Sequence, residues 1–232
     1  MTVHRVRFPV IIARDERALS GPATAARWLF GPYTPLGSDD RIVCANEIWG
    51  GFACYADRET AEAVMADLKK FVPWLPEAGE EWHGLVIPVA HHGEVNWFGP
   101  PGTPAPFRCG ADPGGKLMVI TSAGYNAMPE DELAADMPRR LVFIRQVRNV
   151  QQWLAQAPGN RAATVYSVGR PADAATVSIW DSDAAMHAAI YRPGLHREQM
   201  DRHRTGNLAD RTSFTRARIL CMRGTWDGIR LH

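Results

Sequence analysis

The chain has 232 residues, of which 46% are hydrophobic and 22% charged, the composition of a folded protein with a full core. This composition argues against disorder, and a chain of this length needs no disulfide or structural metal to bury enough surface. Lysine and arginine number 26 and aspartate and glutamate 25, so the formal net charge of +1 provides no field that would gather nucleic acid.

The cysteines and the apolar runs indicate where the protein resides. The four cysteines are scattered and form no C-x-x-C pair, so neither a disulfide framework nor a zinc knuckle is expected. The amino-terminal residues lack the apolar stretch of a signal peptide, and no window has the ~20 apolar residues of a membrane span. We therefore expect a cytoplasmic protein with no transmembrane segment, and leave open peripheral contact with a membrane.

Residues 1–95 are expected to form an amino-terminal half with the order strand, helix, strand, strand, helix, strand. Its predicted elements are a strand at 4–12, a helix at 23–30, a hairpin of strands at 41–45 and 48–56, a helix opened by Asp57, and a strand at 83–91. The helix after Asp57 is defined by an apolar stripe at helical spacing. The stripe consists of Ala61, Val64, Met65, Leu68 and Val72.

Residues 96–138 are expected to be a Gly/Pro-rich connector with an extra strand at 116–122 and a short acidic helix at 129–137. Residues 139–232 then repeat the order of the first half. The predicted elements are a strand at 140–146, a helix at 148–156, strands at 162–169 and 174–180, a helix capped by Asp181 or Ser182 that breaks at Pro193 and resumes over 195–204, and a strand at 214–222.

The repeated order predicts an α+β fold with two ferredoxin-like repeats in tandem. A sheet of this kind carries helices on one face, so its other face must also be buried. Two such sheets in one chain can face each other and form a fold of the dimeric α/β-barrel type. The space between sheet and helices is then a natural ligand site. Sheet edges of such barrels often pair across subunits, which leaves a homodimer open.

The last predicted helix carries the most informative side chains. His196, Met200 and His203 are four and three residues apart and project from one side of a helix. Imidazole and thioether groups are axial ligands of heme iron, whereas tetrahedral zinc would need more acidic, thiol or imidazole ligands nearby. The spacing also fits histidines that simply line a half-buried helix. Four neighbouring arginines could clamp carboxylates or be solvated. They are Arg192, Arg197, Arg202 and Arg204.

The other histidines and motifs are less specific. His4 and His232 lie at the termini, and the pair His91–His92 is expected to be solvated at a strand end, with metal binding as the alternative. The sequence has no G-x-S-x-G elbow, phosphate loop or dinucleotide fingerprint, which disfavours nucleotide chemistry.

Several motifs together resemble the spheroidene monooxygenase family of carotenoid-modifying enzymes. The C-terminal ones are S-I-W-D-S-D-A-A-M at 178–186, G-L-H at 194–196 and G-T-W-D-G at 224–228. In the first half, W-G-G-F at 49–52, E-W at 81–82 and W-F-G at 97–99 follow that family's order and spacing. The arrangement is also similar to heme-degrading monooxygenases and chlorite-dismutase-like proteins of the dimeric α/β-barrel type.

The resemblance implies a heme-dependent monooxygenase that uses dioxygen or peroxide, and an electron donor where needed, to oxidise a hydrophobic small molecule. Heme b would be bound by His196 as the iron ligand, with Trp180 against the pocket, Met200 as a further cofactor-binding residue and His203 as the reserve ligand. One departure, Gly206 to Ala209 in place of an aromatic pair, argues against a carotenoid substrate. The alternatives are a dehydratase, a peroxidase or a heme-degrading enzyme of this fold, or a non-catalytic barrel that binds a hydrophobic ligand.

Overall fold

A computed structural model describes most of the chain. The residues that it describes are 1–9, 22–23, 25–36, 41–72, 75–94, 107–108, 111–126, 128–168, 173–191 and 209–232. In the first half it contains strands β1 (Thr2–Arg7), β2 (Ala25–Leu36), β3 (Arg41–Cys54), β4 (Glu80–Gly93) and β5 (Phe107–Arg108), helices α1 (Arg58–Ala66) and α2 (Leu68–Phe71), and the 3-10 turn η1 (Leu75–Glu77). The second half contains strands β6 (Leu117–Gly124), β7 (Asn160–Val168), β8 (Asp173–Trp180) and β9 (Arg211–Gly224), and helices α3 (Glu130–Leu154) and α4 (Asp183–Tyr191).

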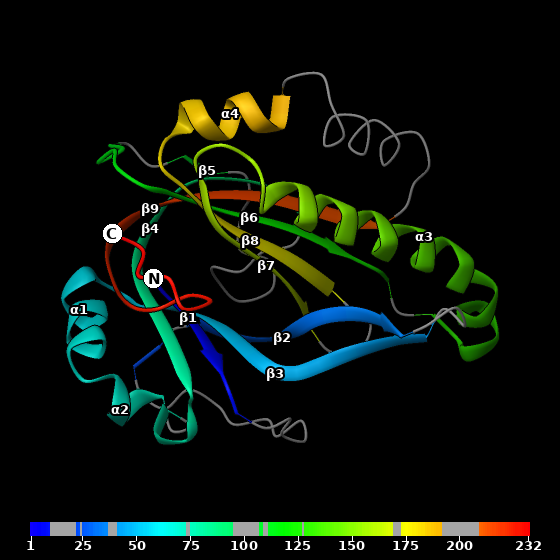
Figure 1. The fold of residues 1–232 in the computed structure, drawn as a ribbon, viewed down its shortest axis with the longest axis horizontal. Helices are drawn as coiled ribbons and strands as arrows, with labels where there is room; N and C mark the ends of the chain where they lie inside the picture. Colours follow the sequence, from blue (N-terminus) through cyan, green and yellow to red (C-terminus); the bar gives the residue numbers. More distant parts are fainter. Residues whose placement is uncertain are drawn as a thin grey trace.

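The strands form a mixed α+β fold around one antiparallel sheet that curls on itself. Its order is β1-β3-β2-β7-β8-β6-β9-β4-β5, and β4 also pairs with β1, so the pairings of eight strands close into a ring. Strands β4 and β9 join the two halves along most of their length, and β2 meets β7 at Phe30 and Ser167. Helices α1 and α2 lie on one side of the curled sheet, and α3 and α4 lie on another (Figure 1).

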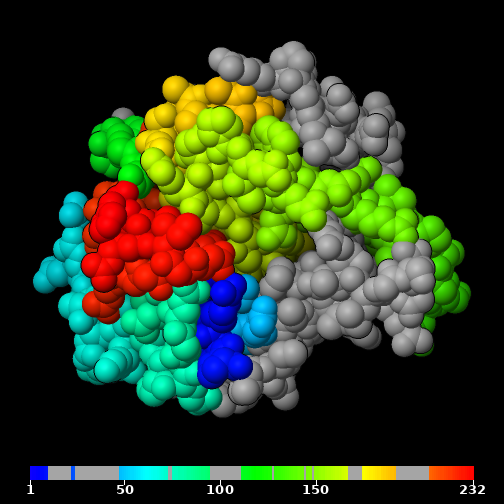
Figure 2. Space-filling model, in the orientation of Figure 1, coloured from blue at the N-terminus to red at the C-terminus, as the bar shows by residue number. Residues whose placement is uncertain are grey.

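The inner face of the sheet forms the main core. Because side chains alternate between the faces of a strand, Val3 and Ile120 point inward together with the indole of Trp82. Arg5 also points inward and is 1% exposed; its guanidinium lies 4.9 Å from the ring of Trp226. It pairs with Glu80 at 3.0 Å and with Asp227 at 2.7 Å. These contacts hold the C-terminal residues beside the amino-terminal strand, as the red and blue segments of Figure 2 show.

The predicted helix after Asp57 is confirmed. The carboxylate of Asp57 accepts a hydrogen bond from the backbone N–H of Thr60 at 2.7 Å, and the predicted apolar stripe is buried under it. The helix is interrupted at Asp67, whose backbone leaves the helical region, so the stripe continues on α2. The strand predicted at 83–91 is confirmed as β4.

Two other predictions for the first half were wrong. Residues 25–30 belong to strand β2 and not to a helix, because β2 pairs with β3 from Ala25 opposite Cys54 to Leu36 opposite Arg41. A short apolar run fits either structure, and here the long pairing with a neighbour decides it. The predicted hairpin at 41–56 is instead one continuous strand, β3. The strand predicted at 4–12 is observed as β1, and residues 10–12 lie outside the described residues.

In the second half, the strand predicted at 140–146 was wrong. These residues lie in the middle of α3, which also absorbs the short helix predicted at 129–137 and the helix predicted at 148–156. Proline in a helix interior removes a hydrogen bond, but α3 continues through Pro138, past the predicted end of the short helix at residue 137. The predicted extra strand is β6, which lies between β8 and β9 in the sheet.

The other elements of the second half are confirmed where they are described. The strands predicted at 162–169, 174–180 and 214–222 are β7, β8 and β9, and the helix after Asp181 is α4. The helix predicted at 195–204 lies outside the described residues. None of the helices in the described ranges is both long and apolar enough to cross a membrane.

Candidate ligand-binding site

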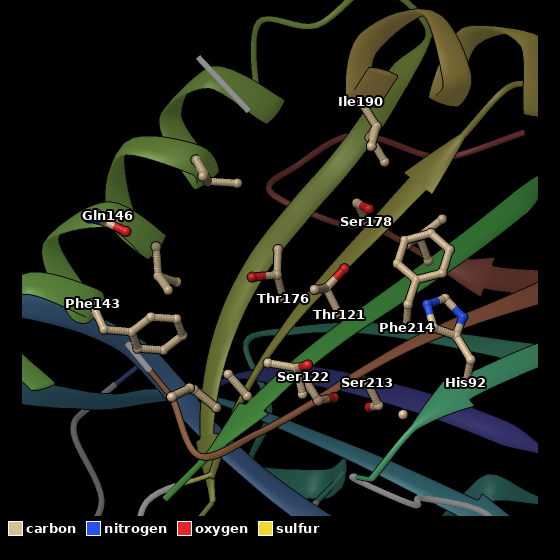
Figure 3. A pocket seen from close by; sticks show the side chains of 18 of the residues that line it. His92, Thr121, Ser122, Phe143, Gln146, Thr176, Ser178, Ile190, Ser213 and Phe214 are labelled. Atoms are coloured by element: carbon tan, nitrogen blue, oxygen red, sulfur yellow. The ribbon is translucent and has the colours of Figure 1, made fainter. Parts of the chain in front are cut away.

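A pocket of about 660 Å³ lies between helix α3 and the outer face of strands β6, β8 and β9 (Figure 3). The end of β4 borders it with His92 and Glu94, and α4 borders it with Ile190 and Tyr191. We call this cavity the α3 pocket. Its volume lies in the range of sites that bind small molecules and cofactors.

The floor of the α3 pocket consists of small side chains from neighbouring strands. In the register of β6 and β8, Thr121 lies opposite Thr176, and Val119 lies opposite Ser178. Phe214 of β9 is on the other side of Thr121. In Figure 3, Thr121 and Thr176 project from the sheet toward the space below α3. The floor therefore presents hydroxyl groups to a ligand.

The opposite wall is apolar. It is formed by residues of α3 that recur four, three and four positions apart and therefore share one helix face. These residues are Phe143, Val147, Val150 and Leu154. Gln146 adds one amide beside them. A ligand between the two walls would meet an apolar surface on one side and hydroxyl groups on the other.

An ion-pair cluster fixes one border of the pocket. Arg139 of α3 donates hydrogen bonds to Asp136 at 2.6 Å and to Asp210, a pocket residue, at 2.8 Å. The guanidinium of Arg140 lies 4.3 Å from the ring centre of Tyr125. Burial alone would raise the pKa of Asp210, but the hydrogen bonds from Arg139 and from a backbone N–H outweigh it and lower that pKa. Asp210 is therefore held as a paired carboxylate.

A second cluster fixes the start of α4. Arg218 of β9 contacts Asp183, the first residue of α4, at 2.6 Å, and Arg216 contacts the same carboxylate at 3.3 Å. Arg218 also donates to Asp112 at 2.6 Å, and this hydrogen bond lowers the pKa of Asp112 to about 2. The first cluster holds α3 beside the residue that precedes β9, and the second holds the start of α4 against β9.

Trp180 lies on the same face of β8 as the lining residue Ser178 but does not itself line the pocket. It is 0% exposed, and its indole N–H donates a hydrogen bond to the Ser178 hydroxyl at 2.9 Å. Ser178 itself lines the pocket. The motif at 178–186 that carries the family resemblance therefore contributes to this site through β8.

The other sequence-predicted site residues are not described. His196, Met200 and His203 lie outside the described residues, as do the four arginines near them. The residues that flank this stretch, Tyr191 and Ala209, both line the α3 pocket. The assignment of His196 as an iron ligand stays a prediction.

The pair His91–His92 divides into two different environments. His91 is 1% exposed, so the expectation of a solvated side chain was wrong for it; its Nδ1 lies 2.7 Å from the Thr215 hydroxyl. Burial lowers its pKa. His92 lines the pocket, and its ring centre is 5.5 Å from that of Phe214. Among the described residues, no three His, Cys, Asp or Glu side chains are grouped to hold a metal.

A second group of buried polar side chains lies on the α1 side of the sheet. Nδ1 of His4 is 2.9 Å from Nδ1 of His83, and the other ring nitrogen of His4 is 2.8 Å from the Thr2 hydroxyl. That hydroxyl is 3.1 Å from the Tyr55 hydroxyl. Burial, followed by the charge of Arg223, lowers the pKa of His4 to about 3. Sequence reasoning missed this pair, because strand register alone brings the two histidines together.

Comparisons with known proteins give no family. No family model matches the chain, and no curated protein matches it either. Similar solved structures include a candidate monooxygenase from Fusobacterium nucleatum subsp. nucleatum, which is 8% identical with a TM-score of 0.41 over 97% of this chain and 93% of that one. An anthrone oxidase-like protein is 16% identical with a TM-score of 0.30 over 98% and 94%. A candidate monooxygenase from Lactobacillus acidophilus NCFM is 8% identical with a TM-score of 0.31 over 97% and 98%. Structural similarity at these identities and TM-scores does not allow the functions of those proteins to be assigned to this chain.

Proposed function

We propose that this protein binds a hydrophobic small molecule in the α3 pocket and is an oxygenase that acts on it. The observation that carries the binding proposal is the pocket itself, with an apolar wall from α3 facing the hydroxyl groups of Thr121 and Thr176. The proposal of oxygenase chemistry rests on the sequence resemblance, part of which falls on Ser178 in the pocket floor.

We further propose that the fold is a pair of ferredoxin-like repeats. The sheet order supports this, because β4-β1-β3-β2 in the first half corresponds to β9-β6-β8-β7 in the second. In each series the fourth strand of the half lies beside the first, the first lies beside the third, and the third lies beside the second. On this proposal the second repeat begins with β6, and not at residue 139.

Heme b remains the proposed cofactor, with His196 as its iron ligand, Met200 as a further cofactor-binding residue and His203 as the reserve ligand. The volume of the α3 pocket and its apolar wall fit a flat macrocycle. The described lining offers the imidazole of His92 and the carboxylates of Glu94 and Asp210, but no lysine or arginine for the propionates. Those cations would have to come from the arginines near His196. Bound heme would supply the activation of dioxygen or peroxide.

The role of the described residues is to bind and enclose the substrate. The α3 face excludes water from the apolar part of the ligand, and the hydroxyl groups of the floor orient its polar atoms. With dioxygen an electron donor is also required, because one oxygen atom must be reduced to water by two electrons when the other enters the substrate. Peroxide already carries these two electrons and needs no donor.

The binding proposal is tested by filling the pocket. Val147 faces the pocket from α3, whereas Val142 is 42% exposed on the same helix. We expect Val147→Trp to abolish most of the fluorescence enhancement of the neutral apolar dye Nile red, and Val142→Trp to leave it unchanged. Urea unfolding of both variants checks that the fold persists. Equal dye binding by the two folded variants would show that the α3 pocket is not the binding site.

The cofactor proposal is tested by the absorption spectrum of the full chain after heme addition. We expect a Soret band that is lost in His196→Ala and kept in His203→Ala. A protein that binds Nile red but stays colourless with heme would overturn the heme proposal and support a non-catalytic barrel. If heme binds, product analysis with isotopically labelled oxygen distinguishes a monooxygenase from a peroxidase, a dehydratase or a heme-degrading enzyme.

A further inference from the structure

The Ser178 hydroxyl is a polar group in the apolar part of the α3 pocket. Ser178 is 3% exposed and lines the pocket from β8. Around it, Val119, Leu154 and Ile190 belong to one apolar cluster and line the same cavity. A hydroxyl group among such side chains strongly affects which ligands bind. A ligand that buries the hydroxyl without forming a hydrogen bond to it binds less tightly, because a buried polar group without a partner costs free energy.

Trp180 determines which further hydrogen bonds the Ser178 hydroxyl can make. Its indole N–H donates to Oγ of Ser178 at 2.9 Å, and the indole side chain has no acceptor to offer in return. The contact therefore uses a lone pair of Oγ and leaves the Ser178 proton available. Trp180 is two residues further along β8, on the same face as Ser178, and is fully buried. Because Ser178 itself lines the pocket, a bound ligand can accept its proton.

We propose that Ser178 determines ligand specificity in the α3 pocket by donating a hydrogen bond to an acceptor oxygen, and that Trp180 is its positioning residue. This rests on the proposed function in one respect, that the pocket binds a hydrophobic small molecule. The ligand class is an apolar ring or chain compound whose carbonyl or ether oxygen lies against Ser178. An isosteric hydrocarbon fills the same space but leaves the Ser178 proton without a partner.

The test compares two probes of nearly the same shape, 9-fluorenone and fluorene, of which only the first has an acceptor oxygen. Dissociation constants are measured with the full chain by tryptophan fluorescence. We expect wild-type protein to prefer fluorenone about tenfold, the scale of one net hydrogen bond. Ser178→Ala should bring the two constants within about twofold. Thr164→Val, which removes a hydroxyl from a side chain of β7 that is also 3% exposed but does not line the pocket, is the matched control and should keep the preference. Thr176→Val examines the other hydroxyl of β8 as the alternative donor.

Trp180 is tested with a readout that a packing defect alone would not change. The carbonyl stretch of bound fluorenone should lie at lower frequency in wild-type protein than in Ser178→Ala, because a donated hydrogen bond weakens the C=O bond. Trp180→Phe removes the indole N–H, and should shift the stretch toward the Ser178→Ala value while fluorene affinity changes less than twofold. Should Trp180→Phe fail to fold, Ser178→Thr keeps the O–H and should keep the wild-type stretch.

The outcomes separate the two proposals. If neither probe binds, the proposed function of the α3 pocket fails. If both bind wild-type protein equally, or if Thr176→Val and not Ser178→Ala removes the preference, the pocket stands and the assignment of Ser178 is overturned.

Discussion

The buried pair His4–His83 should make the protein unusually sensitive to mild acid. The two side chains are 1% and 0% exposed, and their Nδ1 atoms are 2.9 Å apart. Burial first, then the neighbouring imidazole and the charge of Arg223, lowers the pKa of His83 to about 2, and burial with Arg223 lowers that of His4 to about 3. The carboxylate of Glu81, 3.7 Å from Nε2 of His83, is too exposed to offset this.

The sign and size of the effect follow from proton linkage. In the unfolded chain each imidazole has a pKa near 6.5, so below this pH the unfolded state binds protons that the folded state does not. Stability contributed by the neutral pair is therefore present above pH 6.5 and is lost as the pH falls. The loss is about 1.4 kcal/mol per pH unit for each histidine. The slope approaches this value only below pH 6.5, where the unfolded imidazoles are mostly protonated. Between pH 7 and pH 5 the pair should contribute a loss of about 4 kcal/mol, a large share of a typical folding free energy.

Urea unfolding at a series of pH values from 7 to 5 measures this loss. The window lies above the range in which carboxylates titrate, so the slope reports histidines. The double variant His4→Gln/His83→Gln should start less stable at pH 7 but lose about 4 kcal/mol less than wild-type protein across the window. His187→Gln, at an exposed position on α4, is the control and should keep the wild-type slope. The buried His91 also contributes to the slope, but equally in all three proteins. A double variant with the wild-type slope would refute the reasoning.

Two further predictions concern packing and backbone geometry. Leu68→Ala should cost about 2 to 5 kcal/mol of unfolding free energy, because the Leu68 side chain is only 3% exposed. Lys69→Ala, on the exposed side of the same helix, should cost well under about 1 kcal/mol. Similar small losses for both variants in urea unfolding would contradict the assigned helix phase. Gly93→Ala should destabilise the fold more than Gly114→Ala. Both glycines have positive φ, but a Cβ on Gly93 would collide with the Thr212 carbonyl oxygen, whereas a Cβ on Gly114 would meet open space. Equal melting temperatures for the two variants would contradict this.

Local periodicity predicted the parts of the fold that depend on local sequence. The stripe through Leu68 and the cap at Asp57 were predicted correctly because helix phase and capping are set within a few residues. The run from Leu141 to Ile144 was misread as a strand, because consecutive apolar and β-branched residues satisfy both patterns. Residues 25–30 were misread for the same reason, and only their pairing with β3 decides their structure.

The residues of the candidate site come from elements that are far apart in the sequence, so local patterns do not reveal them. The prediction that a ligand site lies between sheet and helices agrees with the position of the α3 pocket. Its individual residues could not be named, because Ser178, Phe143 and His92 come from three elements that only the tertiary fold brings together. His196 was singled out by spacing and resemblance, and the described residues leave that prediction untested. Buried pairs such as His4–His83 depend on strand register and leave no local pattern.

Side-chain size explains why a pocket forms between α3 and its strands, whereas the apolar stripe of α1 and α2 packs directly on the strands beneath it. On the helix-facing side of the first series of strands, Val6 lies opposite Trp49, and these large side chains pack with the stripe that includes Leu68. On the helix-facing side of the second series, Thr121 lies opposite Thr176, and both border the cavity. Small floor residues leave a volume that the apolar face of α3 does not fill. One helix face can therefore pack against the sheet for stability while another leaves room for a ligand, and the size of the side chains on two neighbouring strands makes the difference.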